Sequence, residues 1–149
     1  MKLYVKKFSE LTNEEIRQIY RLRIAVFVVE QNCVYQDVDE YDKCAYHLFY
    51  KDGDEIIAYL RVLPENTFFL SPSIGRVLCT RRRQGLASAL VKEGINTAKE
   101  VFGAKLITIE AQTYVKEMYE KLGFTQVSEE FLEDGIPHIK MELRQEQIL

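Results

Sequence analysis

Hydrophobic positions along the chain alternate between the two-residue period of strands and the longer period of amphipathic helices. Residues 3–8 (LYVKKF) have the strand period and predict a short strand. Thr12 and Glu15 then match a capping box, which predicts the start of a helix. Its end within residues 25–31 (AVFVVEQ) is ambiguous because β-branched side chains disfavour a helix there. Residues 32–44 have no clear period and are predicted as a loop.

The middle of the chain predicts a hairpin followed by a crossover unit. Residues 45–51 and 55–64 are rich in strand-forming residues and flank an Asp-Gly step, which favours a tight turn. Residues 73–80 predict a strand, 85–102 a helix and 105–111 another strand. This order is typical of a βαβ unit with a parallel pair of strands.

The last third predicts one more helix and a final pair of strands. Residues 113–122 have the helical period, and Gly123 follows them as a typical helix end. Residues 124–132 and 137–143 read as strands joined by a turn. The whole pattern predicts an α/β fold with a mixed sheet of six to seven strands and three to four helices.

The composition fits one globular domain covering residues 1–149. The chain has 47% hydrophobic residues and a net charge of −3. Its longest apolar run, residues 25–29, is too short to span a bilayer. Cys33, Cys44 and Cys79 are an odd number at wide spacings, which fits neither a disulfide framework nor a CxxC metal pair. We therefore expect a cytoplasmic protein with reduced thiols, no bound metal and no membrane partner.

Positive charge is concentrated at one junction although the whole chain is acidic. Between Glu65 and Glu93 there is no acidic residue, and five basic residues give this stretch a charge of +5: Arg76, Arg81, Arg82, Arg83 and Lys92. The three consecutive arginines stand where a predicted strand turns into a helix start, whose unpaired amides and dipole favour an anion. Gly85 and Ala87 leave room for a phosphate to approach the backbone. The junction therefore indicates either a phosphate site or a solvated surface.

The chain has neither the GxxxxGK[ST] pattern nor the GxGxxG pattern of nucleotide sites. Residues 82–87 (RRQGLA) instead resemble the acyl-CoA pyrophosphate loop of the GNAT superfamily of N-acetyltransferases, whose pattern is Arg/Gln-x-x-Gly-x-Gly/Ala. Residues 118–124 (MYEKLGF) resemble the second cofactor motif of that superfamily. The stretches 22–42, 74–77 and 135–141 are similar to its ElaA-like branch.

The resemblance implies a GNAT acetyltransferase domain with a centrally splayed sheet and with acetyl-CoA as the donor. It implies that the pantetheine arm lies between the strands 75–80 and 106–111, on backbone groups of Val77, Leu78 and Cys79. For the pyrophosphate it implies the loop and first helical turn, namely Arg82, Arg83, Gln84, Gly85, Leu86, Ala87 and Ser88. The family often has proline at the position of Cys79 and glycine at those of Arg83 and Ala87, so the local geometry is expected to differ.

The resemblance also places Tyr119 near the thioester sulfur, where its hydroxyl would stabilise or protonate the departing thiolate. A tyrosine of ordinary pKa, about 10, donates uphill to a thiol of pKa about 8.5, which favours hydrogen bonding over full proton transfer. A core tyrosine packed beside Phe124 is the alternative. Cys79 fits a small apolar strand residue better than a covalent nucleophile.

Attack on a thioester requires a neutral amine, so the acceptor needs a base or a low pKa. Three side chains are candidates for the base: Glu30 after the first helix, Glu110 at the end of a parallel strand, and His138 after a turn. Because His138 is predicted to be on a strand, it also fits a structural role. The same holds for His47, the only other histidine of the sequence. A base that acts through water is a further alternative.

The acidic segment 37–42 (DVDEYD), together with Glu30, fits two interpretations: recognition of a cationic acceptor, or a solvated loop. The segment lacks the glycine and the glutamate that a calcium loop requires.

The sequence as a whole predicts N-acetyl transfer from acetyl-CoA to a small-molecule or peptide amine, by direct attack without an acyl-enzyme. A catalytically silent acyl-CoA-binding sensor is the alternative. Binding to nucleic acid is disfavoured because the chain is acidic and has no distributed basic face. Dimers are common in the superfamily, so the resemblance also suggests a homodimer.

Overall fold

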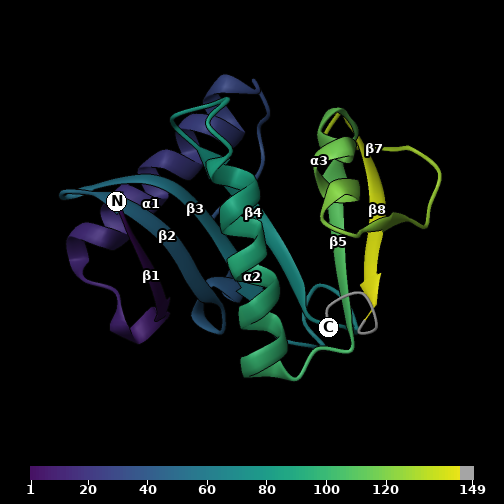
Figure 1. Cartoon of the computed structure of the whole chain (residues 1–149). Helices are drawn as coiled ribbons and strands as arrows, with labels where there is room; N and C mark the ends of the chain where they lie inside the picture. Colours follow the sequence, from purple (N-terminus) through teal and green to yellow (C-terminus); the bar gives the residue numbers. More distant parts are fainter. Residues whose placement is uncertain (145–149) are drawn as a thin grey trace.

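One mixed β-sheet forms the centre of the protein, and helices cover both of its faces (Figure 1). The computed structural model describes residues 1–144. The sheet in this part of the chain has eight strands: β1 (Lys2–Lys7), β2 (Tyr46–Asp52), β3 (Glu55–Leu63), β4 (Ser73–Cys79), β5 (Leu106–Gln112), β6 (Thr125–Gln126), β7 (Phe131–Glu133) and β8 (Ile136–Arg144). Their order is β1-β2-β3-β4-β5-β8-β6, and β7 pairs with β8.

The helices lie on both faces of the sheet and contact strand residues whose side chains point to their own face. They are α1 (Asn13–Arg23), α2 (Leu86–Phe102) and α3 (Lys116–Lys121), with a π-helical segment η2 (Ile24–Glu30) and 3-10 turns η1 (Phe8–Glu10), η3 (Glu40–Lys43) and η4 (Thr113–Val115). Ile19 of α1 packs with Phe49, whereas Leu90 of α2 packs with Leu48. Neighbouring residues of a strand point to opposite faces, so α1 and α2 lie on opposite sides of the sheet.

Most of the expected elements are confirmed, and the differences are local. The capping box is present, because Thr12 Oγ1 accepts the Glu15 N–H and Glu15 Oε1 accepts the Thr12 N–H. The ambiguous residues 25–31 continue α1 as the π-helical η2. Residues 124–132 form two short strands, β6 and β7, instead of one, which explains eight strands where six to seven were expected.

The sheet splays open at its centre, between β4 and β5. These two strands are parallel, and they pair only where Ser73 meets Thr108. Beyond that point they diverge, as Figure 1 shows. Tyr59 is opposite Leu78 and Arg61 is opposite Gly75, so β4 has one residue more than β3 between these pairs. The extra residue is a bulge at Arg76, whose φ of 55° is unusual for a side chain of this size, and a bulge bends its strand.

No helix within residues 1–144 is long and apolar enough to cross a membrane. The cytoplasmic location and the homodimer stay predictions.

Candidate active site

A cavity of about 880 Å³ opens where β4 and β5 separate. It brings together nine of the fourteen residues that the sequence analysis considered for catalysis or donor binding: Glu30, Val77, Leu78, Cys79, Arg82, Ala87, Glu110, Tyr119 and His138. The other five, Arg83, Gln84, Gly85, Leu86 and Ser88, are in the loop and first turn of α2 that also contain Arg82 and Ala87. Segments far apart in the sequence therefore meet around one cavity.

The start of α2 has the features of an anion site. Gly85 precedes the helix with a φ of 74°, and Arg83 also has a positive φ, of 65°. No side chain caps this end of the helix. The amides of its first turn, from Leu86 to Ser88, therefore have no partner within the helix, and they add to the positive end of the helix dipole. Ala87 in this turn lines the cavity.

The excess of positive charge seen in the sequence is largely compensated in space. Arg76 pairs with Asp37 at 3.0 Å, Arg81 with Asp52 at 2.7 Å, and Arg82 with Glu30 at 2.6 Å. Arg83 has no ion pair among the residues that the structure describes. The folded protein therefore keeps one unpaired arginine in the loop before α2, beside the unpaired amides.

The edge of β4 that faces the gap presents free backbone groups. The Thr80 N–H bonds to the Ile57 carbonyl at 2.9 Å, so this amide points to β3. Backbone groups alternate in direction along a strand, so Cys79 turns its N–H and carbonyl toward the gap, and Leu78 turns its own toward β3. The Cys79 thiol donates a hydrogen bond to the Arg81 carbonyl at 3.2 Å.

Tyr119 packs in the core and also lines the cavity. Its ring packs edge-on against Phe124, with ring centroids 5.7 Å apart, and only 7% of the residue is exposed. The same side chain lines the cavity, and no described residue forms a hydrogen bond with its hydroxyl. Burial raises the pKa of Tyr119 above its ordinary value, which makes loss of its proton more costly.

Glu110 lies with Glu133 in the part of the cavity formed by β5, β7 and β8. Burial raises the pKa of Glu110 to about 7, and a hydrogen bond and charge repulsion from Glu133 act in the same direction. Lys140, which is opposite Glu110 in the β5–β8 register, acts against them. The sequence analysis missed Glu133, because a glutamate beside an Asp-Gly turn has no distinguishing signal.

The two other candidate bases have partners of their own. Glu30 accepts both of its hydrogen bonds from Arg82. His138 Nδ1 is 2.7 Å from the Ile136 carbonyl, which only accepts, so this nitrogen donates and Nε2 has the lone pair.

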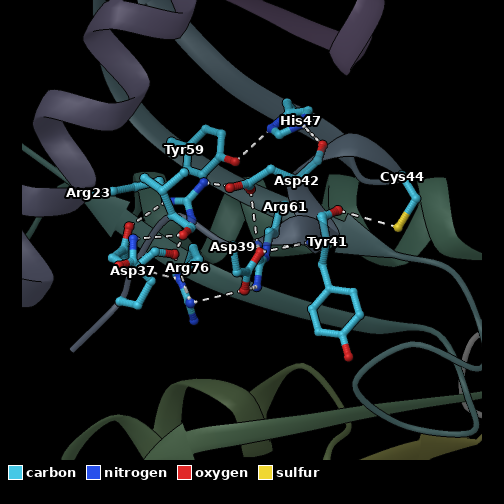
Figure 2. A network of polar contacts seen from close by, with 12 residues as sticks. Arg23, Asp37, Asp39, Tyr41, Asp42, Cys44, His47, Tyr59, Arg61 and Arg76 are labelled. Carbon is cyan, nitrogen blue, oxygen red and sulfur yellow. Dashed lines mark hydrogen bonds and ion pairs between the residues drawn. The ribbon is translucent and has the colours of Figure 1, made fainter.

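The interpretation of the acidic segment 37–42 as a solvated loop is wrong for its aspartates. They form an ion-pair network with arginines from three other elements, and Asp37 and Asp42 are buried (Figure 2). Recognition of a cationic acceptor stays a prediction. Arg23 of α1 pairs with Asp37 at 2.9 Å and with Asp42 at 2.7 Å. Arg61 of β3 binds Asp39 through both of its terminal nitrogens, at 2.6 and 2.9 Å.

This network connects the loop after η2 to the cavity wall. Arg61, Arg76 and Asp39 all line the cavity as well as belonging to the network. The sequence analysis missed Arg23 and Arg61 as buried charges. A signal existed for Arg61, because this arginine interrupts the apolar strand run 56–63.

His47 belongs to the same buried region and not to the cavity. Its Nε2 donates to the Asp42 carbonyl at 3.0 Å, and its Nδ1 accepts from the Tyr59 hydroxyl at 2.7 Å (Figure 2). Burial lowers the pKa of His47, so the ring is neutral and structural. Among residues 1–144 no cluster of histidine, cysteine and acidic side chains has the arrangement of a metal site.

Comparison with known proteins places these features in a family. Residues 9–145 match the family model described as acetyltransferase (GNAT) domain. A UPF0039 protein of Schizosaccharomyces pombe is 37% identical over 142 residues, covering 93% of each chain. Protein ElaA of Escherichia coli is 36% identical over 137 residues, covering 89% of this chain and 90% of ElaA.

Two solved structures are similar over almost their full length. The crystal structure of Escherichia coli ElaA has a TM-score of 0.89 at 32% identity, covering 97% of this chain and 100% of that one. An acyl-CoA N-acyltransferase from Pseudomonas aeruginosa also has a TM-score of 0.89, at 33% identity, covering 96% of this chain and 99% of that one.

Proposed function

Because the chain belongs to the GNAT acetyltransferase family, we propose that it transfers an acetyl group from acetyl-CoA to an amine. The observation that carries this proposal is the gap between β4 and β5, which leads to the uncapped start of α2. A long donor with a thioester at one end and a pyrophosphate at the other fits such a path. The ElaA-like resemblance and the acyltransferase from Pseudomonas aeruginosa support the same class of reaction.

In this proposal different residues of the cavity bind different parts of acetyl-CoA. The free backbone groups of Cys79 bind the pantetheine arm, and Val77 and Leu78 line it. The amides from Arg83 to Ser88 bind the pyrophosphate, with added charge from Arg82 and Arg83. The assignments of Cys79 and of the amides from Leu86 to Ser88 are supported by backbone groups without a partner in the strand pairing or the helix.

The reaction is direct transfer. The amine nitrogen attacks the thioester carbonyl carbon, a C–N bond forms and the C–S bond breaks. Tyr119 stabilises the departing thiolate by donating a hydrogen bond. Its raised pKa favours a shared hydrogen bond over complete proton loss, which agrees with the expectation from ordinary pKa values.

Glu110 is the proposed general base. A carboxyl group whose pKa is about 7 accepts a proton near neutral pH more readily than an ordinary glutamate. It takes the proton from the ammonium form of the acceptor and leaves the neutral amine that attacks. Glu30 is less suited to this role because Arg82 binds its carboxylate, and His138 because its Nε2 lies 3.8 Å from Glu133 Oε2.

Calorimetric titration with acetyl-CoA is the first test. We expect one-to-one binding that weakens about tenfold in Arg82→Ala, because a charged hydrogen bond to phosphate is lost. Arg21→Ala, which removes an exposed arginine from α1, is the matched control and should bind normally. Adenosine 3′,5′-bisphosphate should bind more weakly because it lacks the pantetheine arm. The absence of binding at millimolar acetyl-CoA would contradict the proposal.

Release of free thiol with a panel of primary amines then separates the two candidate functions. Turnover with any amine supports the transferase. Binding of acetyl-CoA without turnover across the panel would support a silent acyl-CoA-binding sensor instead.

A further inference from the structure

Two carboxyl groups share one part of the cavity wall, and only one of them was evident in the sequence. Glu110 is on β5, and Glu133 is the last residue of β7, where it pairs with Ile136 across a tight turn. Both side chains line the cavity. Gln112 of β5 and Phe131 of β7 are both opposite His138, so Glu110 and Glu133, each two residues away on its strand, are on the same face of the sheet as His138. The negative charge of Glu133 also raises the pKa of Glu110. Two carboxylates in contact repel, so one proton is retained between them.

His138 of β8 lies close to Glu133. Its Nε2 is 3.8 Å from Glu133 Oε2, and its ring stacks on Phe131. Because Nδ1 donates to the Ile136 carbonyl, Nε2 presents its lone pair toward the Glu133 carboxyl. The Glu133 side chain is 40% exposed and that of His138 is 12% exposed. Glu133 is therefore the member of this group that reaches solvent, with His138 beside it.

The other groups around Glu110 do not offer such a path. Lys140 is opposite Glu110 in the β5–β8 register, and its ammonium lies over the ring of Phe69. Thr108 and Gln112, two residues away on the same face of β5, carry no charge. On the β4 side Arg76 is paired with Asp37. Glu133 is thus the carboxyl group that acts on Glu110 and also reaches water.

We propose that Glu133 is a positioning residue for Glu110, and that it passes to His138 or to water the proton that Glu110 takes from the acceptor amine. The inference rests on the proposed acetyl transfer. The ammonium acceptor loses one proton to the Glu110 carboxylate, which becomes the acid. Glu133, which holds the proton that the two carboxyl groups share, releases it to His138 Nε2 or bulk water, and the proton on Glu110 then takes its place on Glu133. Glu110 returns to the carboxylate, and no other reactant is needed.

The experiment follows the carboxyl carbon of Glu110 by NMR in protein labelled with ¹³C at glutamate side chains, assigned with Glu110→Gln. In the unmodified protein we expect a midpoint near neutral pH. In Glu133→Gln we expect the midpoint to fall by at least about one pH unit, because the neighbouring negative charge is gone. Glu133→Asp, which keeps the charge, should restore part of the shift. Glu130→Gln removes an exposed carboxylate from the same loop and should leave the midpoint unchanged.

Kinetics provide the second measurement. With an amine that the protein acetylates, the kcat of Glu133→Gln should be about tenfold lower, with little change in the KM for acetyl-CoA. The acidic limb of its pH–rate profile should shift to lower pH by the same amount as the NMR midpoint. An unchanged midpoint in Glu133→Gln overturns the inference even if acetyl transfer is normal. If no amine is acetylated, the proposed function fails, and the NMR titration still decides whether Glu133 controls Glu110.

Discussion

Arg82 donates two hydrogen bonds from Nη2 to the carboxylate of Glu30, at 2.8 and 2.6 Å, at the mouth of the cavity. The pair ties the loop before α2 to the end of η2. Both side chains are well exposed, at 63% and 48%. The same arginine is proposed to contact the pyrophosphate, so Glu30 competes with the donor for its charge.

Glu30→Gln should therefore strengthen the binding of acetyl-CoA. An exposed ion pair contributes about 0.5–1 kcal/mol, so the dissociation constant should fall about two- to fivefold, and by less at high salt. Calorimetry measures the change. Glu40→Gln removes a glutamate paired with Lys43 outside the cavity and serves as the control. Weaker binding in Glu30→Gln would mean that the pair orders the loop instead of competing for Arg82.

Tyr119→Phe should lower kcat by about ten- to a hundredfold, because a hydrogen bond to the departing sulfur is lost where negative charge develops. The affinity for acetyl-CoA should stay the same, since the ring and its packing on Phe124 are retained. Steady-state kinetics and calorimetry together measure the two effects. Tyr114→Phe, at an exposed position on the cavity rim, is the matched control. A normal kcat would remove Tyr119 from the mechanism.

The sequence predicted the elements that depend on local chemistry, and it missed the contacts that depend on distant residues. The capping box at Thr12 and the βαβ unit from β4 to β5 follow from patterns a few residues long. The partners of Asp37 are 14 and 39 positions away, at Arg23 and Arg76. From the sequence alone, such an aspartate cannot be distinguished from one in a solvated loop.

The candidate site shows the same division. The proposed phosphate loop was recognisable because Gly85 and Ala87 are two residues apart directly after three arginines. Glu133 was not recognisable, because its proximity to Glu110 depends on how β7 pairs with β8 and how β8 pairs with β5. The bulge at Arg76, in the pairing of β4 with β3, is also a property of strand pairing and not of local sequence.

Arg23→Met should destabilise the fold strongly. Arg23 is fully buried, and its removal leaves Asp37 and Asp42 without their main positive partner. Breaking a buried ion pair on one side costs about 3–5 kcal/mol of unfolding free energy. Urea denaturation measures the loss. Arg17→Met breaks an exposed pair with Glu14 on the same helix and should change stability little. Equal stability of the two variants would contradict the structural role of the network.

Glu15 should make the stability of the fold depend on acid pH. Burial alone would raise its pKa, but hydrogen bonds from Lys51, the Thr12 amide and Lys6 outweigh burial and lower the pKa from 4.5 to about 2. Because the folded pKa lies below the unfolded one, the contribution of Glu15 is complete above pH 4.5 and is lost as the pH falls toward 2. The shift corresponds to about 3 kcal/mol at neutral pH.

Glu15→Gln keeps the shape of the side chain and an oxygen for the capping box, and it removes the charge that Lys6 and Lys51 bind. Urea denaturation at several pH values should show the variant less stable by about 3 kcal/mol at pH 7, with the difference shrinking below about pH 4.5. Glu100→Gln, at an exposed position on α2, should follow the unmodified protein at every pH. A stability difference between Glu15→Gln and the unmodified protein that stays constant down to about pH 2 would contradict this prediction. The lost stability would then come from packing, because the contribution of an ionised carboxylate disappears when the group is protonated.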